Sequence, residues 1–145
     1  MVQAAGACGA ALDNNENGMN YNILIVDDSK LARMVVMSSL RRIRPDWTVT
    51  EATSGDEALA AVQKGGVQIA LVDFNMPGMD GLALVAKLRE TDKTMPIAVV
   101  SANLQDEVIA RARELNAAFV GKPLTDEALG AFLSGAMLRL RNTTS

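Results

Sequence analysis

The sequence predicts an α/β protein in which helices cover both faces of a parallel sheet, and two observations predict it. Short apolar runs recur at residues 23–26, 69–72, 97–100 and 117–120, and a weaker β-branched run lies at 47–50. Longer segments with helical periodicity separate them. Unbroken apolar runs of this length are typical of strands buried on both faces of a parallel sheet. Five strand–helix units joined by right-handed crossovers therefore account for the whole pattern.

The first two helices have recognisable ends. The first is predicted at residues 29–43, and cations lie near its C-terminal end, where the helix dipole favours them: Arg41, Arg42 and Arg44. The second opens at Ser54, with Glu57 three residues later as in a capping box, and stops at Gly65-Gly66.

The last three helices are predicted from their apolar periodicity and their end residues. We predict them at residues 82–89, at 105–115 and from Thr125 onward, where Leu124 and Leu129 can pack across the first turn. Apolar side chains recur along one face of the last helix: Leu129, Phe132, Leu133, Ala136 and Leu140. We also expect Met34 and Met37, on the first helix, to be core or helix-packing residues, with an adaptable Met surface as the alternative.

Composition limits the possible functions. The chain has 145 residues, 49% hydrophobic and 21% charged, which is typical of one globular domain with a full core. Its net charge of −3 argues against a large nucleic-acid interface. The sequence contains no His, so the usual imidazole base and the commonest zinc ligand are both missing. Any chemistry must come from carboxylates, hydroxyls, Lys or Cys.

Composition also predicts a disordered N-terminal tail and a cytoplasmic location. Residues 1–19 are rich in Gly, Ala and polar side chains, so we expect a disordered tail before a domain spanning 20–142. The single Cys8 cannot form an internal disulfide, which suits a reducing compartment. No apolar run approaches the roughly 18 residues of a membrane span, so we predict a cytoplasmic protein without a membrane segment.

Polar residues follow four of the predicted strands at the point where each strand ends. Asp27 and Asp28 follow the first strand, Asp73 the third, Ser101 the fourth, and Lys122 closely follows the fifth. Each alone is more often a helix cap, a turn residue or a solvated side chain. The carboxyl ends of parallel strands share one edge of the sheet, where ligands bind, so these five side chains should converge.

This set of side chains suits phosphoryl transfer. Three neighbouring carboxylates repel one another, and a hard divalent cation such as Mg²⁺, which prefers oxygen ligands, relieves that repulsion. A carboxylate can serve as a covalent nucleophile, and an ammonium with a hydroxyl can stabilise charge on phosphoryl oxygens. No glycine-rich phosphate loop is present, which argues against an NTPase.

Four motifs carry a resemblance to a known family: IVDDS at 25–29, LVDFNMPGMDG at 71–81, VSA at 100–102 and VGKP at 120–123. Together they resemble the receiver domains of response regulators in bacterial two-component signalling, especially the stand-alone chemotaxis type. The resemblance covers about residues 21–140. It implies a flavodoxin-like sheet with strand order 2-1-3-4-5 and phosphorylation of Asp73 by a histidine kinase, a phosphotransfer protein or a small phosphodonor.

The resemblance also implies roles for the neighbouring residues. Ser101 and Lys122 would contact the phosphoryl group, and the Lys122-Pro123 bond would be cis. Ser101 and Phe119 would form a switch, although Phe119 taken alone is more often a core residue. Mg²⁺ would be held by four residues, the last through its main-chain carbonyl: Asp27, Asp28, Asp73 and Asn75. Side chains at Asn75 and Asn103 would tune dephosphorylation.

Three functions remain open. The first is a single-domain response regulator, not an enzyme beyond its own phosphorylation and dephosphorylation, because the chain ends soon after the last helix. Its output would be a phosphorylation-dependent protein-binding surface, a phosphorelay or a dimer. The second is a Mg²⁺-dependent aspartyl phosphohydrolase, but such enzymes usually carry a second Asp where this chain has Asn75. The third is a scaffold with a vestigial site.

Overall fold

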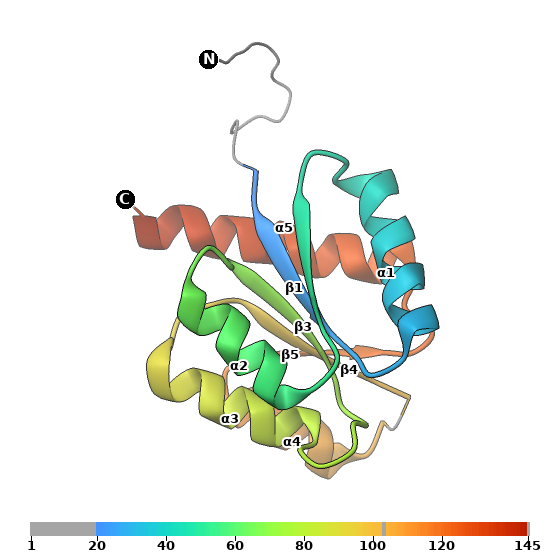
Figure 1. Ribbon diagram of the computed structural model, residues 1–145, viewed down its shortest axis with the longest axis vertical. Coiled ribbons are helices and arrows are strands. Elements are labelled where there is room, and N and C mark those ends of the chain that lie inside the picture. Colours follow the sequence, from blue (N-terminus) through green and yellow to red (C-terminus); the bar gives the residue numbers. More distant parts are fainter. Residues whose placement is uncertain (1–19, 103, 145) are drawn as a thin grey trace.

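The computed structural model describes residues 20–102 and 104–144, in which five strands alternate with five helices (Figure 1). The strands are β1 (Asn22–Val26), β2 (Thr48–Ala52), β3 (Ile69–Asp73), β4 (Ile97–Ser101) and β5 (Ala118–Gly121). The helices are α1 (Lys30–Ile43), α2 (Gly55–Lys64), α3 (Gly81–Thr91), α4 (Asp106–Glu114) and α5 (Asp126–Thr144). The tail predicted for residues 1–19 lies outside this described part.

The strands form one parallel sheet in the order β2-β1-β3-β4-β5, which confirms the predicted fold. The order reverses direction at β1, which pairs with β2 on one side and β3 on the other. Such a switch point leaves a crevice at the carboxyl ends of the strands. The register brings the strand ends level there, with Asp73 beside Val100 and Ser101 beside Gly121.

Two apolar cores lie on opposite faces of the sheet. Along β1, Leu24 and Val26 face the core under α2, α3 and α4, whereas Ile23 and Ile25 face the core under α1 and α5. Figure 1 shows the two helical layers on either side of the strands. All five residues of β3 and of β4 are buried, as expected for strands covered on both faces.

The fifth strand differs from its prediction. The run at 117–120 was expected to be buried on both faces, but β5 is an edge strand, and Ala118 is exposed. Phe119 is partly exposed and packs in neither of the two cores described above. An apolar run alone does not distinguish an edge strand from a central one, because the neighbour on each side depends on the strand order.

The start of α2 also differs slightly from the expected capping box. The Ser54 hydroxyl accepts a hydrogen bond from the Glu57 N–H at 3.2 Å, as predicted. The Glu57 carboxylate, however, accepts from the Thr53 N–H at 2.7 Å and the Thr53 hydroxyl at 2.8 Å, one residue before Ser54. These hydrogen bonds lower the pKa of Glu57 below its usual value.

Gly81 lets α3 begin directly against the end of β3. A Cβ atom at this position would lie 2.6 Å from the Asp73 carbonyl oxygen and 2.8 Å from the Phe74 Cα. We therefore expect Gly81→Ala to lower the free energy of unfolding by about 1–3 kcal/mol. Gly135, on α5, has open space around it, so Gly135→Ala should raise the same quantity by about 0.5–1 kcal/mol. Urea denaturation measures both changes, and shifts of the same sign would contradict this packing.

Candidate functional site

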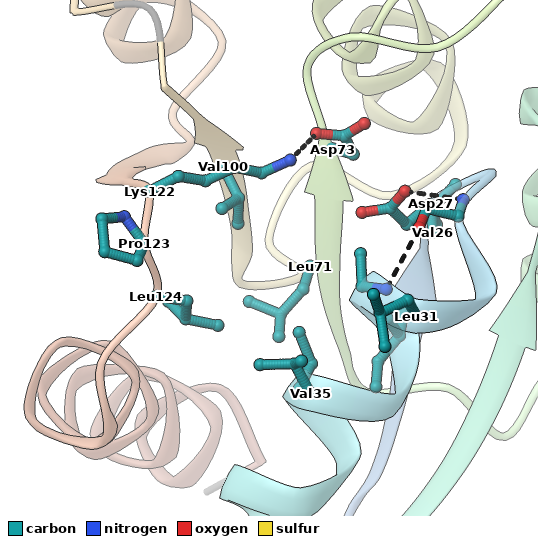
Figure 2. Close-up of a pocket in the computed structure, with 14 residues that line it drawn as sticks. Val26, Asp27, Leu31, Val35, Leu71, Asp73, Val100, Lys122, Pro123 and Leu124 are labelled. Atoms are coloured by element: carbon teal, nitrogen blue, oxygen red, sulfur yellow. Dashed lines mark hydrogen bonds and ion pairs between the residues drawn. The ribbon is translucent and has the colours of Figure 1, made fainter.

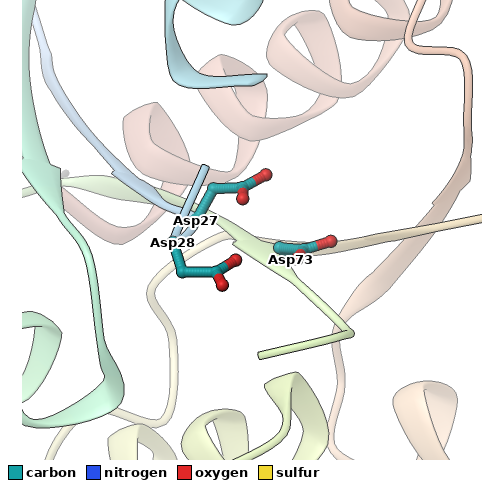
Figure 3. A group of neighbouring side chains, drawn as sticks. All are labelled: Asp27, Asp28 and Asp73. Carbon is teal, nitrogen blue, oxygen red and sulfur yellow. The ribbon is translucent and has the colours of Figure 1, made fainter. Parts of the chain in front are cut away.

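Three carboxylates gather at the carboxyl edge of the sheet. Asp27 and Asp28 follow β1, Asp73 ends β3, and one carboxylate oxygen from each lies within 4.8 Å of the others (Figure 3). Asp27 and Asp73 are buried, whereas Asp28 is exposed. The sequence prediction placed these residues together because adjacent parallel strands end at the same edge.

This donor set fits Mg²⁺. The ion takes oxygen ligands at about 2.1 Å in an octahedron, so oxygens on one ion lie roughly 3–4 Å apart. Three carboxylate oxygens within 4.8 Å are close to that spacing. Asn75, whose carbonyl was predicted to be a further ligand, is exposed in the loop two residues after Asp73. Its role as a ligand stays a prediction.

Asp27 is held from two elements. Its Oδ1 accepts a hydrogen bond from the Ser29 N–H at 2.9 Å, and its own N–H donates to the Ala52 carbonyl at 3.1 Å. Burial raises the pKa of Asp27 above its usual value, and the nearby Asp73 charge raises it further. The hydrogen bond from Ser29 and the charge of Lys122 oppose that increase.

Lys122 reaches the site from the loop between β5 and α5. Its Nζ lies 2.8 Å from Asp73 Oδ1, while its side chain is still 36% exposed (Figure 2). Asp73 Oδ1 is fully buried, and the contact has the geometry of an ion pair rather than of an aligned hydrogen bond. The Lys122-Pro123 peptide bond is cis. The structure therefore brings an ammonium against one of the three carboxylates.

Ser101 completes the group of residues at this edge. It ends β4, one residue beyond the level of Asp73 on the neighbouring strand, and it is 0% exposed. Its carbonyl accepts a hydrogen bond from the Lys122 N–H at 3.0 Å, which ties β4 to the start of the loop after β5. Asn103, predicted to flank the site, lies outside the described residues.

A groove beside the carboxylates was missed by the sequence prediction. It has a volume of about 340 Å³ and runs between α1 and the loop after β5, with Asp73 and Lys122 at one end of its lining (Figure 2). Its walls are mostly apolar and include Leu31 and Val35, which are 71% and 53% exposed. Leu31 and Val35 are four residues apart, which places them on the same face of a helix, so this spacing could have predicted the apolar wall. Met34, predicted to be a core or helix-packing residue with an exposed Met surface as the alternative, is 49% exposed on this helix.

The fold and the site together define a doubly wound α/β protein with three carboxylates and an ammonium at the carboxyl edge of its sheet. Comparison with known proteins agrees with that class: residues 23–134 match the family model of the response regulator receiver domain. The chain belongs to this family.

The relatives range from small receivers to large sensors. The chain is 33% identical over 124 residues to the chemotaxis protein CheY-3 of Vibrio cholerae, covering 83% of this chain and 95% of that protein. It is also 33% identical over 132 residues to the sensor histidine kinase RcsC of Salmonella typhi, covering 90% of this chain but 13% of the kinase. The same kind of domain thus occurs in both settings.

Solved structures show the same architecture. The chemotaxis protein CheY4 of Vibrio cholerae superposes with a TM-score of 0.74 at 29% identity, covering 81% of this chain and 99% of that one. A CheX–CheY–BeF3–Mg²⁺ complex from Borrelia burgdorferi gives a TM-score of 0.77 at 23% identity, covering 86% and 94%. Within residues 20–102 and 104–144, no helix is both long and apolar enough to cross a membrane.

Proposed function

We propose that this receiver domain accepts a phosphoryl group on Asp73 in a Mg²⁺-dependent reaction and signals through the resulting change. One observation carries the proposal. The buried Asp73 carboxylate lies 2.8 Å from the Lys122 ammonium, and one of its oxygens lies within 4.8 Å of those of Asp27 and Asp28. These distances support the proposed roles of Asp73 as the nucleophile, of Lys122 as the cation and of Asp27 and Asp28 as metal ligands.

The proposed step is a displacement at phosphorus. An Asp73 carboxylate oxygen attacks the phosphorus atom, and the bond from phosphorus to the donor nitrogen or oxygen breaks with its electron pair leaving on the donor. Lys122 and the Ser101 hydroxyl compensate the negative charge that builds up on the phosphoryl oxygens. Asp27, Asp28, Asp73 and the Asn75 carbonyl would hold Mg²⁺, which would supply further positive charge near the reacting groups.

Partners follow from the same proposal. The phosphodonor would be a histidine kinase or a phosphotransfer protein, and the relationship to the sensor kinase RcsC supports this class of donor. Output would go to a protein target or onward in a phosphorelay, in a cytoplasmic setting and without direct contact to nucleic acid. The complex of a CheY with CheX supports a protein as the partner. Phosphorylation would act through Ser101 and Phe119, with either a monomer or a phosphorylation-dependent dimer as the product.

Intact-mass measurement tests the proposal. The full chain is incubated with acetyl phosphate, with Mg²⁺ or with EDTA, and weighed. We expect one added phosphoryl group that requires Mg²⁺, survives acid, is lost in base and is missing in Asp73→Ala. Continuous hydrolysis of many phosphoesters would instead indicate a phosphohydrolase. No adduct with acetyl phosphate or with histidine kinases would indicate a scaffold.

A further inference from the structure

Arg33 is a buried cation that contacts the main chain of Asp27, and none of the roles described above uses it. It lies one turn into α1 and is 9% exposed. Its guanidinium makes two short hydrogen bonds: Nη1 donates to the Asp27 main-chain carbonyl at 2.7 Å, and Nε donates to Glu51 Oε1 at 2.7 Å. The planar fork of one side chain therefore joins β2 to the loop that follows β1.

The hydrogen bond from Arg33 to the Asp27 carbonyl also restrains the backbone at Asp28. The Asp27 carbonyl belongs to the peptide group that joins Asp27 to Asp28, and the Asp27 N–H is already fixed on the Ala52 carbonyl at 3.1 Å. Holding both sides of Asp27 fixes the plane of the next peptide group. That plane fixes where the Asp28 Cα lies, and so the point from which the exposed Asp28 side chain leaves the backbone.

The charge of Arg33, taken alone, would weaken cation binding at the neighbouring carboxylates. A guanidinium near a cation site repels the cation, but Glu51 accepts a hydrogen bond from this one and compensates much of its charge. The Glu51 side chain is 42% exposed, so solvent also screens the pair. The geometric contribution of Arg33 is favourable to a metal site, and its electrostatic contribution is unfavourable.

We propose that Arg33 is a positioning residue for the divalent-cation site: it orients the Asp27-Asp28 pair through the carbonyl between them. This inference rests on the proposed function, because it assumes that the three carboxylates bind Mg²⁺. Groups that orient metal ligands typically contribute 10–100-fold to metal affinity.

The test is the Mg²⁺ affinity of the unphosphorylated full chain, measured by isothermal titration calorimetry. We expect Arg33→Met to weaken Mg²⁺ binding by about 10–100-fold, because the Asp27-Asp28 peptide group loses its donor. Arg33→Lys should weaken it less, since one ammonium can replace one of the two hydrogen bonds but lacks the fork to make both.

Arg42 provides a matched control on the same helix. It is exposed and donates two hydrogen bonds to Asp126, at 2.8 Å from Nε and 2.9 Å from Nη2, and neither of these involves the acidic cluster. Arg42→Met should lower the thermal unfolding midpoint while leaving the Mg²⁺ affinity unchanged.

The outcomes separate the inference from the function on which it rests. Mg²⁺ affinity in Arg33→Met that equals or exceeds that of the wild type would overturn the positioning role, even if the thermal midpoint falls. A wild-type chain that binds no Mg²⁺ would overturn the proposed function and the inference with it. If Arg33→Met does not fold, Arg33→Lys decides: weaker binding supports the role, and unchanged binding overturns it.

Discussion

Lys122→Ala is expected to lower the rate of phosphoryl transfer to Asp73 by about 10²–10³-fold, the usual cost of removing one group that stabilises developing charge. The reason is the position of the ammonium, 2.8 Å from a fully buried oxygen of Asp73. Initial rates with acetyl phosphate at saturating Mg²⁺, followed by intact mass, measure the change. Lys87→Ala, at an exposed position on α3, should leave the rate unchanged.

Mg²⁺ affinity makes the Lys122 prediction more specific. Removing the ammonium takes a positive charge away from the carboxylate cluster, so Mg²⁺ should bind at least as tightly to Lys122→Ala as to the wild type. Slow transfer with intact Mg²⁺ binding would assign Lys122 to the phosphoryl group. Parallel losses of rate and of Mg²⁺ affinity would contradict that role and indicate a disturbed metal site.

Removing each of the two cations near the cluster, Lys122 and Arg33, should therefore change the Mg²⁺ affinity in opposite directions. Lys122 contacts a carboxylate directly, so its removal reduces repulsion toward Mg²⁺. Arg33 contacts a main-chain carbonyl and Glu51, so its removal should loosen the ligands while changing the charge little. Measuring Mg²⁺ affinity in both variants on one protein distinguishes an electrostatic effect from a geometric one.

The sheet and its acidic edge could be predicted because both depend on local sequence. Alternating apolar runs and helical segments are consequences of burial, and residues at strand ends share an edge in any parallel sheet. Asp27, Asp28 and Asp73 came together for that reason. The strand order itself came from the family resemblance, since the alternation is compatible with several orders.

The contacts that were missed join residues far apart in the chain. Arg33, on the helix after β1, hydrogen-bonds Glu51 on β2, and the register between β1 and β2 determines where Glu51 lies. The Asp126 carboxylate accepts hydrogen bonds from Arg42 and from the Ser39 hydroxyl, which hold its pKa down at about 2. These two residues precede it by 84 and 87 positions. No periodicity in the sequence predicts such pairs, because they depend on how α1 and α5 pack.

The packing of α5 should contribute strongly to stability. Leu133 is 0% exposed in the core under α1 and α5, so Leu133→Ala leaves a cavity as well as losing apolar burial. We expect the free energy of unfolding to fall by about 2–5 kcal/mol. That is a large fraction of the roughly 5–15 kcal/mol that stabilises a typical domain. Urea denaturation measures it as a lower midpoint with an unchanged slope.

Leu138 on the same helix provides the control for this change. It is 53% exposed, so Leu138→Ala removes the same atoms from a position that packing does not enclose. Its effect should stay within about 0.5 kcal/mol, as is usual for surface positions. Equal losses for the two variants would mean that α5 contributes through its helical propensity rather than through its buried face. A large difference would show that the core under α5 holds the helix in place. Because Lys122 lies only four residues before α5, the same core would then help to fix the ammonium against Asp73.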